Sequence, residues 1–305
     1  MNIQQTLLEL EPCLPSPLQK IEADILQQKS IQLYIKRDDL IHPLISGNKW
    51  RKLKFNLLQA EQQGYDTLLS FGGAYSNHIH ALAAAGKAFG FKTIGIIRGD
   101  EPRELNHTLR FAVEQGMALH FVDRETYRQK HSSEFQAALK KQFGEVYILP
   151  EGGSNQLALP GCAEIVDELV QQLPTQTFSI VTACGSGGTA AGLLSHPSVP
   201  EVTGVAVLKG AGFLADEVQS LLKQQSLNFN LVLDYHYGGY ARYTPQLETF
   251  IADFKNKFGI PLEPIYTGKM LFALFDMIKN DKFAPGTNLV ALHTGGLQGY
   301  QNERF

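Results

Sequence analysis

The stretch Ser46-Gly47-Asn48-Lys49-Trp50-Arg51-Lys52-Leu53 decides how the rest of the chain is interpreted. A glycine–asparagine turn leads into a predicted helix, in which the spacing of the apolar residues indicates one buried face: Trp50, Leu53, Leu57 and Leu58. Asn48 is a favourable N-cap residue, so Lys49 falls in the first turn. The helix dipole is positive there and disfavours a cation by about 0.3–1 kcal/mol.

This position of Lys49 has two interpretations. In the first, the residue is a solvated lysine that follows a helix cap and has no further role. In the second, the site lowers the proton affinity of the amine, as a Schiff-base lysine requires, because only a neutral amine attacks a carbonyl group. The other loops of the chain have to decide between the two.

Composition sets broad limits on the fold and the partners. A chain of 305 residues with 44% hydrophobic and 19% charged residues is long enough for one large or two modest globular domains. The net charge of -3 gives no field that would attract nucleic acid or an acidic membrane. No apolar run approaches the ~18 residues of a membrane span, and Met1 to Gln5 have no signal-peptide pattern. We therefore expect a cytoplasmic protein without membrane or nucleic-acid partners.

The three cysteines, Cys13, Cys162 and Cys184, are scattered and odd in number. They have no metal-ligand spacing, and their number argues against a disulfide framework. We expect a reducing compartment and no bound metal.

Apolar strand-like runs alternate with helical patterns along most of the chain. The strands are predicted at 31–36, 67–71, 92–97, 118–122, 146–149, 178–183, 202–208, 231–233 and 289–293, and the longer helices at 79–89, 103–115, 126–142, 157–173, 213–224, 244–258 and 269–279. A short helix is also predicted within 18–28. This alternation predicts an α/β fold with parallel sheets. Two β-rich regions, roughly 50–150 and 150–305, predict two lobes around a shared cleft, with ligands at the carboxyl ends of the strands.

A glycine loop follows the strand at 178–183 and precedes a helix start. Its residues are Gly185, Ser186, Gly187, Gly188 and Thr189. Glycines let backbone N–H groups approach an anion closely, and two hydroxyls add donors, so the loop suits a single phosphate. It lacks the lysine of a Walker A loop and the spacing of a dinucleotide fingerprint. The alternative is a tight strand-to-helix turn that needs glycine for backbone reasons alone.

Gly72-Gly73-Ala74-Tyr75-Ser76-Asn77-His78 forms a second polar loop at a strand-to-helix junction. Its serine and asparagine are donors for a substrate carboxylate, or simply N-cap residues. His78 and His80 are two residues apart and do not share a helix face, which argues against a metal pair.

Two further segments place polar groups before a helix and after a strand. Glu263 to Lys269 contains Tyr266, either a catalytic phenol or a packing residue. Thr294 follows the last predicted strand, where a ligand would meet it. A lysine at a helix start, a carboxylate loop, a phosphate loop and this threonine together suit a phosphorylated aldehyde cofactor better than a nucleotide.

In combination these loops resemble the motifs of the pyridoxal-phosphate enzymes of fold type II, in the group of 1-aminocyclopropane-1-carboxylate deaminase and D-cysteine desulfhydrase. The matching segments extend over nearly the whole chain: Lys36-Arg37-Asp38-Asp39-Leu40, Ser46-Gly47-Asn48-Lys49 with Arg51-Lys52-Leu53, Gly72-Gly73 with Ser76-Asn77-His78, Gly185 to Thr189, Pro264 to Lys269 and His293-Thr294-Gly295-Gly296. The resemblance implies a two-domain α/β fold like that of the tryptophan synthase β-subunit. The large cofactor-binding domain would comprise residues 1–51 and 150–305, and the small domain residues 52–149.

The resemblance also implies how the chain binds pyridoxal 5'-phosphate. Lys49 would form the Schiff base with the cofactor, and the loop from Gly185 to Thr189 would bind its phosphate group. Asn77 would reach its phenolic oxygen, and Thr294 would border the ring.

For the substrate, the resemblance implies a carboxylate site made by Ser76, Asn77 and His78. Tyr266 would be the catalytic tyrosine, with Thr267 beside the substrate and Ser76 also in the catalytic set. Lys49 would move a proton at the substrate carbon. Loss of a β-substituent and hydrolysis would then release a 2-oxo acid and ammonia. A homodimer is implied as well.

Substrate choice depends on two threonines. Cyclopropane-opening members have glutamate after the tyrosine and leucine before the last Gly-Gly, whereas this chain has Thr267 and Thr294. This pattern resembles the desulfhydrases and favours D-cysteine as substrate, with weak or absent ring opening. The alternatives are 1-aminocyclopropane-1-carboxylate deaminase, another deaminase or racemase on the same scaffold, and a non-catalytic binding protein. Ala74-Tyr75 and Ile79-His80 depart from the group's pattern, which has an arginine at the position of His80.

Overall fold

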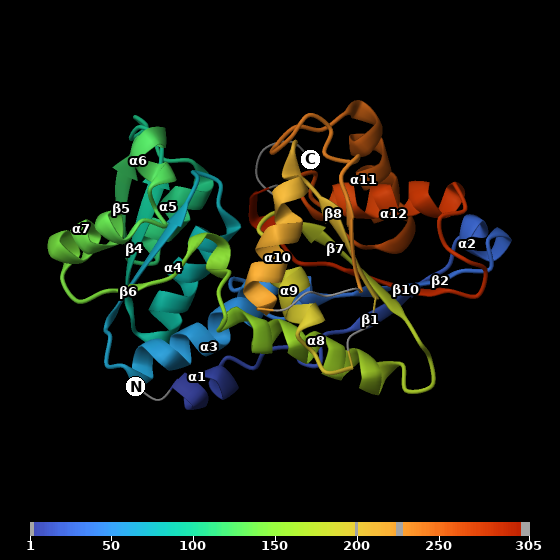
Figure 1. Cartoon of the computed structure of the whole chain (residues 1–305), viewed down its shortest axis with the longest axis horizontal. Coiled ribbons are helices and arrows are strands. Elements are labelled where there is room, and N and C mark those ends of the chain that lie inside the picture. The colour runs from blue at the N-terminus through green and yellow to red at the C-terminus, as the bar shows by residue number, and fades with distance from the viewer. Residues whose placement is uncertain (1–2, 199–200, 224–227, 300–305) are drawn as a thin grey trace.

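The computed structural model describes residues 3–198, 201–223 and 228–299, and it contains two separate sheets of mainly parallel strands (Figure 1). The larger sheet has the order β1-β2-β10-β7-β8-β9, and only its β1–β2 pair is antiparallel. Its strands are β1 Leu18–Ile21, β2 Gln32–Lys36, β7 Ser179–Cys184, β8 Glu201–Ala206, β9 Phe229–Val232 and β10 Asn288–Leu292. The predicted parallel-rich α/β fold is confirmed.

The smaller sheet has the order β5-β4-β3-β6, with every neighbouring pair parallel. Its strands are β3 Thr67–Gly72, β4 Lys92–Arg98, β5 Met117–Val122 and β6 Tyr147–Ile148. In Figure 1 this sheet and its helices lie beside the larger sheet, with α3 below the smaller sheet and α8 below the larger one.

The helices fill the space around the two sheets. They are α1 Ile3–Glu9, α2 Asp24–Gln28, α3 Asn48–Gln62, α4 Asn77–Phe89, α5 His107–Glu114, α6 Arg124–Arg128, α7 Ser133–Phe143, α8 Ala158–Gln172, α9 Gly188–Leu194, α10 Leu214–Leu222, α11 Pro245–Phe258 and α12 Thr267–Lys279. Short 3-10 turns lie at Asp38–Leu40, Glu151–Gly153, Ala211–Phe213 and Leu297–Gly299. Among the described residues, no helix combines the length and apolarity needed to cross a membrane.

In two places the structure differs from the predicted helices in the number or type of elements. The segment 126–142 contains two helices because Ser132 begins a new one, its hydroxyl accepting a hydrogen bond from Phe135 N. The first half of 18–28 is strand β1, since its backbone pairs antiparallel with β2. Both errors arose where a cap or a distant strand, rather than local periodicity, set the boundary.

The last strand of the larger sheet brings distant parts of the chain together. β10 lies between β2 and β7, so the residues that follow all three strands meet at one edge of the sheet. That edge receives Arg37, Gly185 and His293 from three separate regions. Ligand loops were expected at such strand ends, and the glycine loop and Thr294 lie at this edge.

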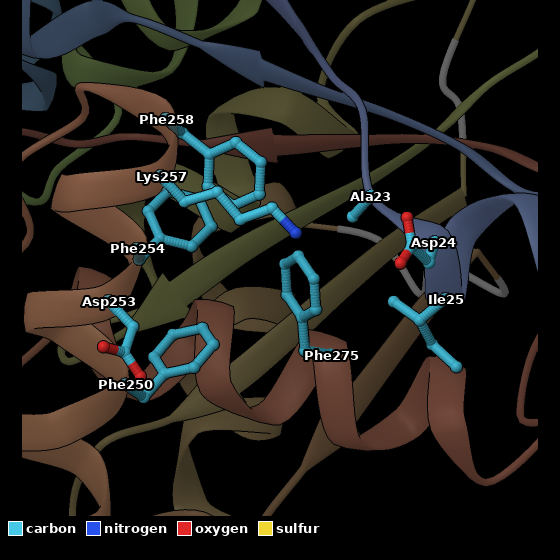
Figure 2. A pocket seen from close by; sticks show the side chains of 9 residues that line it. All are labelled: Ala23, Asp24, Ile25, Phe250, Asp253, Phe254, Lys257, Phe258 and Phe275. Atoms are coloured by element: carbon cyan, nitrogen blue, oxygen red, sulfur yellow. The ribbon is translucent and has the colours of Figure 1, made fainter.

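A pocket of about 310 Å³ lies between α2, α11 and α12 (Figure 2). Its lining is largely aromatic, with charged groups among the rings: Ala23, Asp24, Ile25, Phe250, Asp253, Phe254, Lys257, Phe258 and Phe275. None of these is a predicted site residue. The candidate site therefore lies elsewhere, at the strand ends described above.

Candidate active site

The start of α3 is pressed against the end of β10. Gly47 adopts a positive φ of 64°, and a Cβ atom there would overlap the carbonyl oxygen of Thr294. The amide of Asn48 donates to that same oxygen at 3.3 Å. Only glycine fits this contact, so the Gly47-Asn48 turn fixes where Lys49 enters the molecule.

Asn48 is not the helix cap that its sequence position predicted. Gly47 occupies the N-cap position, and no side chain caps the helix. The Asn48 amide instead donates to Thr189 Oγ1 at 2.9 Å and accepts from Lys49 Nζ at 2.8 Å. The lysine amine is therefore connected through one amide group to the predicted phosphate loop.

The surroundings of Lys49 favour the neutral amine. Loss of water around the amine and, to a lesser extent, the positive charge of Lys52 together lower its pKa to about 7. No carboxylate among the described residues forms an ion pair with Lys49 that would offset this shift. An amine with this pKa is partly neutral near pH 7 and can attack an aldehyde.

The glycine loop joins β7 to α9 and forms a polar cup. Gly187 has a positive φ of 69° at the start of α9. A Cβ atom at Gly188 would lie 3.0 Å from Lys52 Nζ and would overlap the Ser154 hydroxyl. Ser154 Oγ lies 2.8 Å from Ser186 Oγ. Backbone amides, hydroxyls and an ammonium group thus meet at this loop, a donor set that fits a phosphate group.

Lys52 is the residue of this cup whose role the sequence reasoning missed. Its side chain is buried, and Nζ donates to Ser154 Oγ at 3.0 Å. The signal was present, because residues three apart lie on the same helix face and Lys49 was already singled out. Burial lowers the pKa of Lys52, which an anion in the cup would counteract.

The loop after β3 contacts the end of β10. Ser76 accepts a hydrogen bond from Ile79 N at 3.3 Å and caps α4, which confirms the alternative prediction that it is an N-cap residue. Asn77 Oδ1 accepts from Gln298 Nε2 at 2.6 Å, and a Cβ atom at Gly296 would lie 2.9 Å from Asn77 Nδ2. The predicted carboxylate loop of the smaller sheet therefore lies next to the turn that follows Thr294.

The ring of His78 is directed into the protein. Its Nε2 lies 2.8 Å from Ser70 Oγ, and Ser70 in turn donates to Leu149 O at 2.9 Å. Burial lowers the His78 pKa to about 3, and the nearby charges of Lys49 and Lys52 act in the same direction, so the ring is neutral. Its Nδ1 has no hydrogen-bond partner among the described residues.

Glu263 organises the loop that contains Tyr266. Its buried carboxylate accepts from the backbone N–H groups of Ile265 at 2.7 Å, Tyr266 at 2.9 Å and Thr267 at 2.6 Å. Thr267 Oγ1 also donates to it at 3.0 Å. The Thr267 hydroxyl, which was predicted to lie beside the substrate, is thus engaged within its own loop.

Tyr266 reaches the phosphate loop and pairs with a second phenol. A Cβ atom at Gly185 would lie 3.0 Å from Tyr266 Cε1. The ring centroids of Tyr240 and Tyr266 are 6.1 Å apart. Burial raises the pKa of Tyr266 well above its usual value and raises the pKa of Tyr240 as well, so both phenols are protonated near neutral pH.

Tyr240 was absent from the sequence reasoning, and a buried lysine holds its loop in place. Lys269 Nζ donates to the carbonyl oxygens of Val207 at 3.3 Å, His236 at 2.9 Å and Gly239 at 2.8 Å. These contacts join residues about 30 and 60 positions apart, so they cannot be predicted from a local sequence pattern. Glycine–tyrosine pairs such as Gly239-Tyr240 are too common to identify a site residue.

Comparison with known proteins agrees with this geometry. The family model described as pyridoxal-phosphate dependent enzyme matches residues 11–295. A D-cysteine desulfhydrase of Salmonella typhi is 30% identical over 87% of this chain and 87% of its own length. A bifunctional D-cysteine desulfhydrase/1-aminocyclopropane-1-carboxylate deaminase of Arabidopsis thaliana is 32% identical, covering 94% of this chain and 77% of that protein.

A putative 1-aminocyclopropane-1-carboxylate deaminase of Thermotoga maritima is 33% identical over 93% of this chain and 95% of its own length. A solved structure titled as an ACC deaminase homologue superposes with a TM-score of 0.79 at 30% identity, covering 98% of this chain and 96% of that one. The Lys49 amine beside a phosphate cup agrees with these similarities, and the chain belongs to the family of pyridoxal-phosphate-dependent enzymes.

Proposed function

We propose that this enzyme is a lyase that removes the β-substituent of a small D-amino acid, with D-cysteine as the foremost substrate. Water and D-cysteine would give a 2-oxo acid, ammonia and hydrogen sulfide. The observation that carries the proposal is the Lys49 amine, with a pKa near 7, connected through Asn48 to Thr189 of the phosphate cup. The names of the Salmonella and Arabidopsis relatives support the choice of substrate.

The cofactor site would be assembled from residues of both sheets. Lys52 and the hydroxyls of Ser186 and Thr189 would bind the phosphate group, together with the backbone of Gly185, Gly187 and Gly188. Asn77 and Thr294 would border the ring. When bound, pyridoxal phosphate supplies an aldehyde for Lys49 and a ring that withdraws electrons from the substrate α-carbon.

The remaining groups would act on the substrate. Ser76, Asn77 and the backbone at His78 would bind its carboxylate, because the His78 ring is held by Ser70. Lys49 would take the proton from the α-carbon. Tyr266, whose raised pKa keeps the phenol protonated, would donate a proton to the departing substituent. Thr267 would act mainly through the conformation of this loop, since Glu263 accepts its hydroxyl hydrogen.

We further propose that residues 1–51 with 150–305 form the large cofactor-binding domain and residues 52–149 the small domain. The two sheets support this division, since β1 and β2 pair with strands from the second half of the chain. A cytoplasmic homodimer without nucleic-acid partners completes the proposal.

Replacing Lys49 tests the cofactor role directly. Purified protein should show the visible absorbance band of a lysine-bound aldehyde cofactor, and Lys49→Ala should lose this band and its turnover. Lys92→Ala is the matched control, because Lys92 is an exposed lysine on β4 and should retain both. A wild-type protein that neither contains nor binds the aldehyde would remove the proposal.

A substrate panel tests the reaction. Sulfide release should be faster from D-cysteine than from L-cysteine, and ammonia release from 1-aminocyclopropane-1-carboxylate should be weak or absent. The second candidate, cyclopropane ring opening, is favoured by the name of the Thermotoga relative and would show the reverse order. Turnover of serine, racemisation, or tight binding without turnover would each replace the D-cysteine assignment.

A further inference from the structure

The carboxamide of Asn48 lies between the Thr189 hydroxyl and the Lys49 amine, which are not hydrogen-bonded to each other. Its Nδ2 donates to Thr189 Oγ1 at 2.9 Å, and its Oδ1 accepts from Lys49 Nζ at 2.8 Å. Thr189 is buried at the start of α9 in the phosphate cup, whereas Asn48 and Lys49 open α3. One side chain therefore bridges the cup and the amine.

The polarity of an amide gives this bridge a direction. The oxygen only accepts and the NH₂ group only donates, so an ammonium form of Lys49 requires Oδ1 on its side. The NH₂ group then faces Thr189, whose oxygen accepts the bond. The hydrogen of the Thr189 hydroxyl remains free for another acceptor, and the oxygens of a phosphate in the cup are such acceptors.

The backbone around Asn48 holds the bridge in place. The Asn48 amide donates to Thr294 O at 3.3 Å, and Gly47 is packed against the same carbonyl group. This explains why the side chain does not cap its own helix, although asparagine is well suited to that role. The main chain of Asn48 contacts the residue after β10, while its side chain contacts Thr189 of α9.

We propose that Asn48 is a positioning residue that couples the phosphate cup to Lys49, orienting the Thr189 hydroxyl toward the phosphate and holding the amine beside it. The inference rests on the proposed function for Lys49 and the cup. It assigns to Asn48 a role beyond helix formation. If this proposal holds, a change at Thr189 alters the pKa of Lys49, because the Asn48 side-chain amide connects the two residues.

The test measures the titration of Lys49 in the cofactor-free full-length protein. Trace acetylation with acetic anhydride between about pH 5 and pH 10 reports the amine pKa, and the exposed Lys92 in the same sample serves as an internal control. We expect Asn48→Ala and Thr189→Val each to lower the Lys49 pKa by about one unit, a tenfold loss of proton affinity, because the ammonium form loses its fixed acceptor. The double variant should shift it no further than either single variant.

Thr189→Ser supplies the rescue, since it keeps the bridging hydroxyl and should retain the wild-type titration. If Thr189→Val leaves the Lys49 titration unchanged, or if Thr189→Ser shifts it as far as valine does, the coupling is refuted. Additive shifts in the double variant would refute it as well. Because no cofactor or amino acid is present, these results are independent of whether D-cysteine is the substrate.

Asn48→Asp provides a second measurement that conserves the shape of the side chain. The carboxylate keeps an acceptor for Lys49 but has no donor for Thr189, so the Lys49 pKa should rise. The affinity of the cofactor-free protein for inorganic phosphate, measured by calorimetry, should fall about tenfold. Unchanged phosphate affinity in Asn48→Asp would contradict the proposed orientation of Thr189.

Discussion

The two faces of α3 show how the same type of charge takes opposite roles. Lys49 and Lys52 share one face and have no carboxylate partner among the described residues, so burial lowers the pKa of both. Arg51, two positions after Lys49, points to another face and lies between two carboxylates. It contacts Asp38 at 2.9 Å and Glu168 at 2.7 Å.

The Arg51 face forms a buried ion network. Glu168 also pairs with Lys36 at 2.6 Å, and Ser16 Oγ donates to Asp38 at 2.6 Å. The two carboxylates raise the pKa of Arg51 further above its usual value and offset the effect of burial. The carboxylates beside Arg51 thus keep this buried cation charged and give it a structural role, whereas Lys49 and Lys52, which have no carboxylate partner in the described part of the chain, are poised to bind an anion or to lose a proton.

Among substitutions of the α3 cations, Arg51→Leu should have the largest effect, a loss of folding stability. The buried Asp38 and the partly buried Glu168 would lose their shared partner, which should cost about 3–5 kcal/mol of folding stability. Urea unfolding monitored by circular dichroism measures this change. Arg51→Lys keeps the positive charge but not the forked set of donors, so its folding stability should lie between that of the wild type and that of Arg51→Leu. A loss below 1 kcal/mol would show that the network contributes little.

The next largest effect concerns Lys52→Gln on the opposite face. Loss of a charged hydrogen-bond donor in the cup should weaken pyridoxal phosphate binding by about 10–100-fold. Folding stability should change far less than in Arg51→Leu, because no buried carboxylate is left unpaired. Fluorescence titration of the cofactor-free protein measures the affinity. Equal affinities for wild type and variant would mean that Lys52 lies outside the phosphate site.

The smallest effect is a dependence on pH. The Lys49 pKa is lowered to about 7, so the neutral amine predominates above pH 7 and the ammonium below it. Capture of pyridoxal phosphate by the cofactor-free protein should slow about tenfold per pH unit below 7 and reach a plateau above it. Stopped-flow absorbance gives this profile. In Lys52→Gln the midpoint should move upward, because the positive charge that lowers the Lys49 pKa is gone.

Several parts of the site were predictable from local patterns. The helix that begins near Lys49 and the glycine loop after β7 each lie within one contiguous stretch, as does the Ser76 cap. Backbone requirements dominate in such segments, and glycine and capping residues report them directly.

Other assignments needed contacts between distant segments. Asn48 had the composition of a cap, yet its amide bridges to Thr189, 141 positions away. Tyr240 became a candidate only because Lys269 fixes its loop beside Tyr266. The Thr267 hydroxyl was expected at the substrate, but Glu263 accepts its hydrogen.

The sequence alone therefore determined the α/β class, the position of Lys49 at a helix start, and the loops able to bind a phosphate and a carboxylate. These follow from periodicity and from the conformational preferences of glycine and capping residues, which act over a few residues. Only the tertiary structure decided which buried cations are paired. Arg51 meets Glu168 and Lys52 meets Ser154 across more than 100 positions of chain. Burial lowers the pKa of both groups, and only for Arg51 do carboxylates more than offset this effect.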